Sequence, residues 1–165
     1  LHLSIRRQRQ MCIRDRNYDE GVFIGYRWYE AKNIEPLYPF GYGLSYTSFE
    51  YEKVSVSKES FKENDEIELA VTIKNTGNVA GSEIVQIYIE DVESSVDRPI
   101  KELKGFSKIH LKNGESGEVK IILTSKDFSF WNPATKTWFA ETGKFKIHIG
   151  SSSSDIKFIK EVILQ

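Results

Sequence analysis

Apolar and polar residues alternate along most of this chain after residue 49. In EIELAVTIKN, residues Ile67, Leu69, Val71 and Ile73 fall on one face of an extended strand. The same period of two recurs in residues 82–91, 118–124, 143–150 and 155–165. Turn sequences such as NTGN, KNGE and WNPATKTW separate these runs. About seven short strands with such spacing predict an all-β, immunoglobulin-like antiparallel sandwich.

Polar residues inside these strands are predicted to face away from the core. In SEIVQIYIED the alternation turns Gln86 and Tyr88 outward. It also turns His110 and His148 away from their apolar neighbours. A metal site or a catalytic pair would need both histidines on one face beside a carboxylate, so we expect two solvent-facing side chains instead.

The residues before the sandwich have a different pattern. VFIGYRWY, residues 22–29, is apolar and aromatic with one charge, and it predicts a buried strand. Its Arg27 then needs a carboxylate or carbonyl partner. Two prolines and two glycines within residues 36–43 mark a linker, and the interleaved aromatic residues indicate that this linker packs.

Residues 1–16 resemble translated DNA-sequencing adapter. The run RRQRQMCIRDR can be encoded by a string similar to the adapter of transposase-based library kits, and LHLSI fits its flank. We expect residues 1–16 to be a disordered artefact joined in frame to a gene. The alternative is a basic arm behind a natural start.

Charge and cysteine content exclude several functions. Residues 1–16 hold five basic residues against one acid, whereas the whole chain has a net charge of −1, so the remainder is acidic. An acidic body does not fit nucleic-acid binding, and no apolar run reaches the roughly 20 residues that cross a membrane. Cys12 is the only cysteine, so no thiolate metal site is expected, nor any cofactor.

Two groups of residues remain as candidates for chemistry. Acidic residues cluster at 90–93 and at 19–20, and we expect them to be solvated rather than to act as an acid/base pair. An aromatic group at residues 128–139 includes Trp131 and Trp138. We expect these rings to fill the core or a seam to another domain; alternatively, they stack on sugar rings.

The stretch EGVFIGYRWYEAKNIEPLYPFGYGLSYTSFEY resembles the C-terminal part of glycoside hydrolase family 3 enzymes, the β-glucosidases and β-xylosidases. The rest is similar to their fibronectin type III-like domain. The resemblance implies that residues 17–48 are the last strand and linker of an α/β domain, and that residues 49–165 are the fibronectin type III-like domain. It also implies that both catalytic carboxylates lie upstream, so no catalytic, cofactor-binding or metal-binding residue is assigned here.

The resemblance implies a non-catalytic scaffold of a retaining β-glucosidase-like enzyme, inactive alone. Its partners would be the upstream catalytic domains, a β-glucoside or oligosaccharide substrate for the parent, and a second copy if the parent is a homodimer. The alternatives are an autonomous carbohydrate-binding sandwich and a plain adhesion domain. The loop at residues 93–102 is expected on a neighbouring domain or subunit. The interdomain anchor is predicted to comprise Tyr26, Arg27, Trp28, Pro39, Phe40, Gly41, Gly43, Leu44 and Tyr46.

Overall fold

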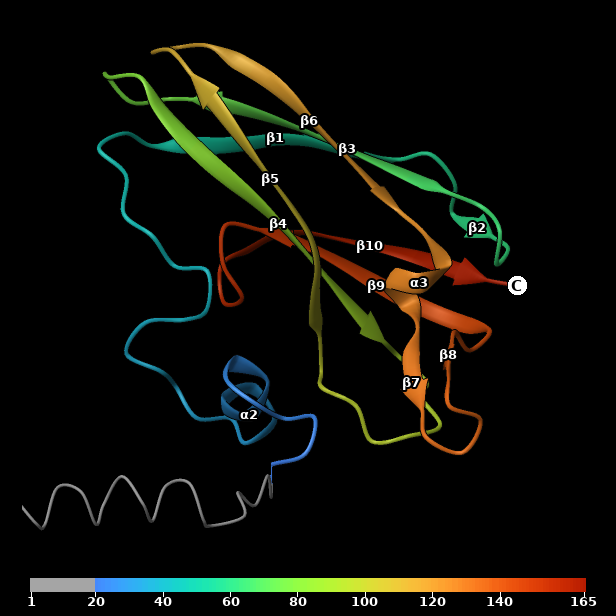
Figure 1. The fold of residues 1–165 in the computed structure, drawn as a ribbon. Helices are drawn as coiled ribbons and strands as arrows, with labels where there is room; N and C mark the ends of the chain where they lie inside the picture. The colour runs from blue at the N-terminus through green and yellow to red at the C-terminus, as the bar shows by residue number, and fades with distance from the viewer. Residues whose placement is uncertain (1–19) are drawn as a thin grey trace, which may run out of the picture.

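The computed structural model describes residues 20–165 as a two-layer β-sandwich with a segment packed along one side (Figure 1). The adapter-like residues 1–16 and the candidate acid Asp19 lie outside the described residues. The all-β fold class predicted from the alternation is confirmed.

Two sheets form the sandwich. The first is three-stranded, in the order β1 (Phe49–Val56), β3 (Ile67–Asn75) and β6 (Ser116–Leu123). The second is five-stranded, in the order β2 (Ser60–Phe61), β10 (Ile156–Leu164), β9 (Gly143–Gly150), β4 (Gly81–Asp91) and β5 (Glu102–Leu111). Only β2 and β10 pair in parallel. A short helix α3 (Ser125–Phe128) leads into a hairpin of β7 (Phe130–Asn132) and β8 (Thr137–Phe139).

The core lies between the two sheets, where the alternation predicts it. Ile67, Leu69, Val71 and Ile73 of β3 are completely buried, and the apolar residues of β4, β6 and β9 face them. Three phenylalanine rings close one end of the core; they are Phe61, Phe128 and Phe145. Burial of this apolar surface is the main source of the fold's stability.

The prediction of a buried strand at residues 22–29 is wrong. Residues Tyr26–Ala31 form a helix, α2, and no strand of the described sheets includes any residue from 20 to 48. A strand needs a neighbour for its backbone hydrogen bonds, whereas a helix satisfies them within itself. The amide of Lys32, for example, donates to the carbonyl of Trp28 at 3.0 Å. Because no strand lies beside these residues to pair with them, the helix is the conformation that satisfies their backbone hydrogen bonds.

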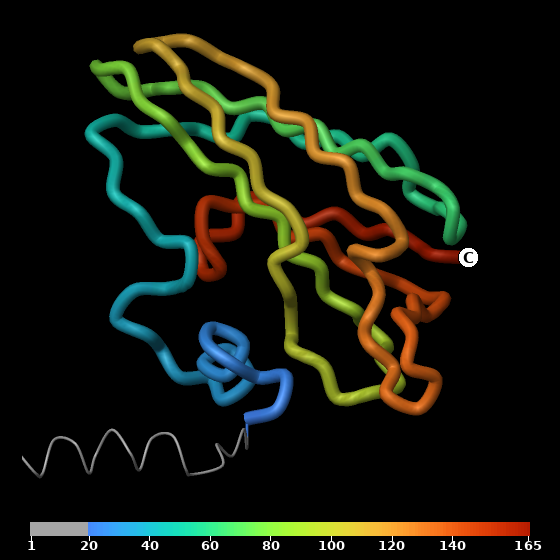
Figure 2. The backbone as a smooth tube through the Cα atoms, in the orientation of Figure 1, coloured from blue at the N-terminus to red at the C-terminus, as the bar shows by residue number. Residues whose placement is uncertain are grey.

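Residues 20–48, called the N-terminal segment from here on, cover the outer face of the five-stranded sheet (Figure 2). The prediction that Gln86 and Tyr88 point away from the core is right about the face. Neither side chain meets solvent, however, because Gln86 is 6% exposed and Tyr88 is completely buried. Residues 85–89 of strand β4 are therefore buried on both faces, and the outer face of this part of the strand is a docking surface.

Candidate functional site

The two histidines do not form a catalytic or metal-binding pair. His110 lies opposite Ser82 and His148 opposite Tyr88, six residues further along β4. At about 3.3 Å per residue the two positions are roughly 20 Å apart. His110 is exposed, as predicted. The prediction for His148 is wrong: its side chain is 11% exposed, because Glu90 lies beside it with Oε2 at 2.6 Å from Nε2.

The expectation that the acids at 90–93 are solvated is wrong for Asp91. Its side chain is 5% exposed and accepts a hydrogen bond at 2.9 Å from Arg98, which is itself buried. Burial raises the pKa of Asp91 even with the Arg98 guanidinium beside it. Arg98 also lies over the ring of Phe130, at 5.4 Å from the centroid. The loop at 93–102 is therefore fixed to its own sandwich, and its contact with a neighbouring domain stays a prediction.

Helix α2 docks on the sheet through Tyr26. The ring of Tyr26 stacks on Phe40 at 4.5 Å between centroids and meets the edge of Tyr88 at 6.0 Å. Its hydroxyl accepts a hydrogen bond of 2.8 Å from the amide of Leu103 on β5. One side chain thus joins the helix, the linker and two strands. The mutual packing of three aromatic rings stabilises this contact beyond the effect of the area alone.

Glu102 collects three cations where the N-terminal segment meets β5. Its Oε1 lies 2.9 Å from Arg27 Nη2, so the partner predicted for Arg27, a carboxylate or a carbonyl, is the Glu102 carboxylate. Its Oε2 lies 3.3 Å from both Arg98 and Lys104. Burial alone would raise the pKa of Glu102, but Lys104 and Arg27, with Arg98, lower it below its usual value of 4.5. The ionised carboxylate is therefore the stabilised form.

We expect Glu102→Gln to lower the free energy of unfolding at neutral pH by about 1–3 kcal/mol, because three cations lose their shared carboxylate. A lowered pKa in the folded state gives stability that is complete above the unfolded value of 4.5 and is lost as pH falls through the folded value. The difference from the unsubstituted chain should shrink as pH falls below 4.5. Urea unfolding across a pH series measures it; a difference that is independent of pH would contradict the assignment.

Gln86, in the middle of strand β4, fixes the beginning of the crossover loop, residues 39–48, to the sheet. The Gln86 amide nitrogen donates to the carbonyls of Gly41 at 3.0 Å and Ser151 at 2.5 Å. Its oxygen accepts from the Tyr88 hydroxyl at 2.6 Å. The amide of Ser153 adds a bond of 2.9 Å to the carbonyl of Phe40. A buried amide with all these partners specifies one position of the loop.

The C-terminal end of the crossover loop is held by Asn75, which is completely buried at the end of β3. The Thr47 hydroxyl donates to Asn75 Oδ1 at 2.6 Å. The Asn75 amide nitrogen donates to the carbonyls of Val79 and Leu111. The loop is thus fixed at Gly41 and at Thr47, and the residues between them form an arch, residues 42–46.

The predicted anchor residues fall into two groups. Tyr26, Arg27, Phe40 and Gly41 contact the sandwich, as described above. The others contact it less or not at all. Trp28 packs under Lys32 of its own segment, and Gly43 has open space around it. Leu44 is 89% exposed, and Tyr46 is fully exposed. Pro39 caps the turn before the arch through its carbonyl. The N-terminal segment therefore has an inner face bound to the sandwich and an outer apolar face.

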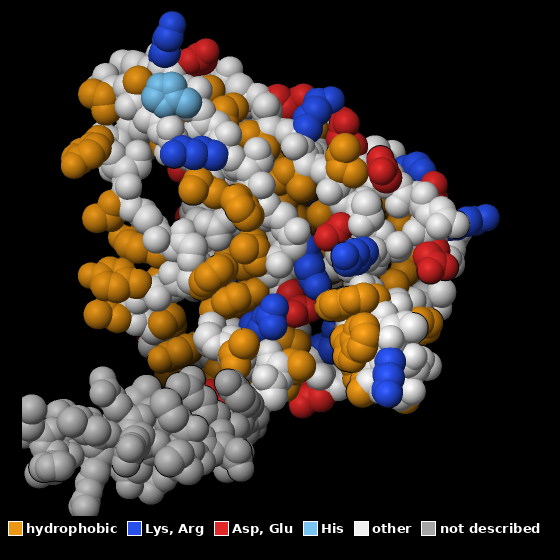
Figure 3. Space-filling view, viewed as in Figure 1, with side chains coloured by type: hydrophobic (Ala, Val, Ile, Leu, Met, Phe, Trp, Pro, Cys, Tyr) orange, Lys and Arg blue, Asp and Glu red, His pale blue; other side chains and the backbone are white. Residues whose placement is uncertain are grey.

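The outer face is large. Figure 3 shows hydrophobic side chains gathered along the N-terminal segment on one side of the molecule. Contiguous exposed apolar surface of this kind is typical of an interaction site. Its largest exposed members are Val22, Ile24, Ile34, Leu37, Tyr38, Tyr42, Leu44 and Tyr46.

Sequence reasoning missed the residues of the sandwich that receive the N-terminal segment. Gln86 and Tyr88 carried a signal, because they are large polar side chains on the outward face of an otherwise apolar strand. Asn75 and Glu102 carried no such signal. In the sequence, Asn75 is typical of a turn, and Glu102 is typical of the charged end of a strand.

Of the aromatic group at residues 128–139, expected to fill the core or a seam to another domain, Phe128 of α3 lies in the core, whereas Trp131 and Trp138 do not, and a seam stays a prediction for them. Trp131 and Trp138 are 50% and 57% exposed. Their rings cross at 73° with centroids 5.8 Å apart. This leaves one exposed aromatic pair at the end of the sandwich, away from the N-terminal segment (Figure 1).

Over residues 20–165, no cluster of three or more His, Cys, Asp and Glu side chains is placed to hold a metal ion. No helix in the same residues is long and apolar enough to cross a membrane.

Several known proteins contain a region similar to this chain. Residues 83–153 match the family described as the fibronectin type III-like domain. The chain is 52% identical over 139 residues to thermostable β-glucosidase B of Acetivibrio thermocellus. This match covers 84% of this chain and 18% of that protein. It is 49% identical over 140 residues to β-glucosidase BoGH3A of Bacteroides ovatus, covering 85% of this chain and 19% of that protein.

A solved structure has the same fold. The GH3 β-glucosidase of Bifidobacterium adolescentis superposes with a TM-score of 0.83 at 39% sequence identity, covering 89% of this chain and 21% of that one. The chain spans about a fifth of the length of the relatives that it matches.

Proposed function

Because this chain corresponds to the C-terminal region of the glycoside hydrolase family 3 β-glucosidases, we propose that it is the non-catalytic scaffold of such an enzyme. The observation that carries the proposal is the two-faced N-terminal segment. Its inner face is fixed to the sandwich at Tyr26, Gly41 and Thr47, and its outer face exposes apolar residues. A segment built in this way joins the sandwich to a second surface.

The second surface is the upstream catalytic region of the same protein. In this proposal residues 17–48 link two domains, and residues 49–165 form the fibronectin type III-like domain. The parent enzyme hydrolyses terminal β-glycosidic bonds with retention, which requires two carboxyl groups across the sugar. Both belong to the upstream region, so the present chain is inactive alone. A parent homodimer would add a second copy as a partner.

A chimeric enzyme tests the proposal. In thermostable β-glucosidase B, the matched C-terminal region is either deleted or replaced by residues 20–165 of this chain. We expect the chimera to hydrolyse an aryl β-glucoside, and the deletion to lower the soluble, active yield at least several-fold because the unfolded fraction rises. Equal yield and heat resistance from the deleted enzyme would contradict a scaffold role. The present chain alone should show no hydrolysis.

The second candidate is carbohydrate binding through Trp131 and Trp138. Their exposure favours it, since exposed aromatic rings can stack on sugars. Their crossed orientation provides no shared flat platform, which favours the scaffold. A tryptophan fluorescence titration with soluble β-glucans separates the two, because a scaffold gives no saturable response from these residues.

A further inference from the structure

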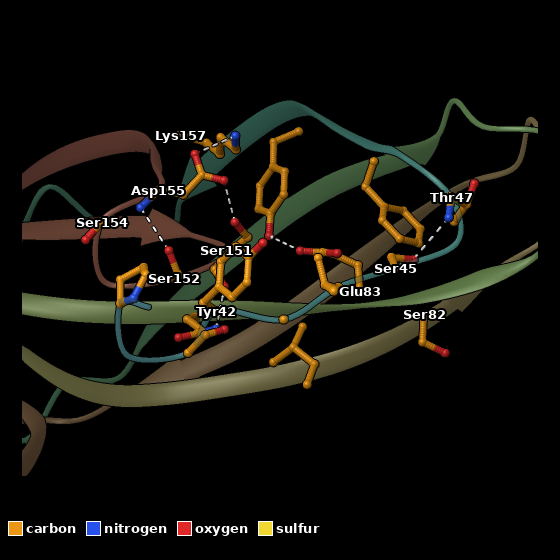
Figure 4. Close-up of a pocket in the computed structure, with 18 residues that line it drawn as sticks. Tyr42, Ser45, Thr47, Ser82, Glu83, Ser151, Ser152, Ser154, Asp155 and Lys157 are labelled. Carbon is orange, nitrogen blue, oxygen red and sulfur yellow. Dashed lines mark hydrogen bonds and ion pairs between the residues drawn. The ribbon is translucent and has the colours of Figure 1, made fainter. Parts of the chain in front are cut away.

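A cavity of about 610 Å³ lies beneath the arch, in the size range of small-ligand pockets. The arch forms one wall, and strands β1 and β4 form the other. Residues 151–157 close one end (Figure 4). The fixed points at Gly41 and Thr47 hold the arch over the strands, so the cavity is a feature of the fold.

The wall of the cavity carries a carboxylate with spare hydrogen-bonding capacity. Glu83 Oε1 accepts a hydrogen bond of 3.0 Å from the hydroxyl of the buried Tyr51. Within residues 20–165, Glu83 Oε2 accepts none. Burial raises the pKa of Glu83, as expected for a carboxylate partly withdrawn from water. Such an oxygen accepts strongly from a ligand hydroxyl.

The closed end of the cavity adds both donors and acceptors. Asp155 Oδ2 accepts from the Ser151 hydroxyl at 2.5 Å, and its Oδ1 lies 2.6 Å from Lys157 Nζ. The lining also includes the aromatic rings of Tyr42 and Phe49. Figure 4 shows Glu83 and Asp155 spaced along one cavity rather than side by side.

From this lining we propose that the cavity binds a neutral polyhydroxylated ring, such as a monosaccharide, with Glu83 as its main hydrogen-bond acceptor. Vicinal hydroxyls both donate and accept, which matches a wall of carboxylates, hydroxyls and an ammonium group. Two carboxylates against one lysine repel an anion. The aromatic rings provide a face for the C–H side of a sugar. This site is separate from the proposed scaffold function and does not depend on it.

Nuclear magnetic resonance titration of the full 165-residue chain with D-glucose and with cellobiose tests the proposal. We expect saturable shifts in the amides of residues 41–47, 82–86 and 151–157, with a dissociation constant in the millimolar range. Glu83→Gln should weaken binding at least about tenfold, equivalent to about 1.4 kcal/mol. Tyr51→Phe should also weaken it, because Glu83 loses its positioning hydrogen bond. The double variant Trp131→Ala and Trp138→Ala is the matched control and should bind as the original chain does.

Three outcomes overturn the proposal. The first is an absence of saturation with either sugar in a folded chain. The second is unchanged affinity in both Glu83→Gln and Tyr51→Phe. The third is a set of shifts centred on Trp131 and Trp138 that disappears in the control, which assigns the sugar to the hairpin. If the Glu83 variant unfolds, Tyr51→Phe decides between the outcomes, because it removes one oxygen and keeps the ring in the core.

Discussion

Replacing Arg98 with alanine is expected to lower the free energy of unfolding by about 3–5 kcal/mol, the range for removing one partner of a buried ion pair. Arg98 is 8% exposed, and it pairs with Asp91 at 2.9 Å and with Glu102 at 3.3 Å. Its removal leaves Asp91, which is 5% exposed, without its cation. Equilibrium urea unfolding of the 165-residue chain measures the change.

An exposed ion pair supplies the matched control for Arg98. Lys58 lies 2.7 Å from Asp65, but the two side chains are 43% and 36% exposed. Lys58→Ala should therefore change the free energy of unfolding far less than Arg98→Ala does. Similar losses from both substitutions would contradict a special role for the buried pair.

Gly41→Ala is expected to release the crossover loop and to cost about 2–4 kcal/mol. Gly41 has φ of +80°, which strains any residue with a side chain. A Cβ atom there would clash with Gln86 Oε1. The Gln86 side chain must then move away from the Gly41 and Ser151 carbonyls and the Tyr88 hydroxyl, leaving them without a partner. Amide hydrogen exchange of residues 39–48 should accelerate, and the free energy of unfolding of the whole chain should fall.

Gly43→Ala is the control, two residues further along the same loop. Its backbone lies outside the left-handed region, and no atom lies within 4 Å of a Cβ placed there. We expect Gly43→Ala to leave stability and exchange unchanged or slightly improved. If both substitutions release the loop, then general sensitivity of the loop, rather than the contact between Gly41 and Gln86, explains the effect.

The chimeric enzyme connects these predictions to function. With Gly41→Ala in the chimera, the inner face of the N-terminal segment should lose its fixed position while the outer face is unchanged. A scaffold role predicts that the yield of active enzyme falls with the stability of this one contact.

The sandwich could be predicted from sequence because its core depends on local periodicity. A strand with one buried face alternates with a period of two, and Ile67, Leu69, Val71 and Ile73 carry that pattern without reference to any partner. The position of Arg27 in an apolar run likewise implied a carboxylate or carbonyl partner, since a charge withdrawn from water requires one. The pattern could not identify Glu102 as that partner, because the two residues meet only after β5 has been placed.

The conformation of residues 22–29 could not be predicted in the same way. An aromatic run of eight residues fits a buried strand or a helix packed on one side, and the choice depends on what lies beside it. The backbone hydrogen bonds of α2 are closed within the helix, so Tyr26 is free to pack on Phe40 and Tyr88.

The sequence by itself determined the fold class, the faces of the strands and the resemblance to family 3 enzymes, because each of these depends on residue spacing along the chain. Only the tertiary structure decided that Gln86, Asn75 and Glu102 receive the N-terminal segment, and that Gly41 requires its glycine while Gly43 does not. The physical reason is that hydrogen bonds and ion pairs between distant residues depend on register and on the loop path, and neither leaves a periodic signal in the sequence.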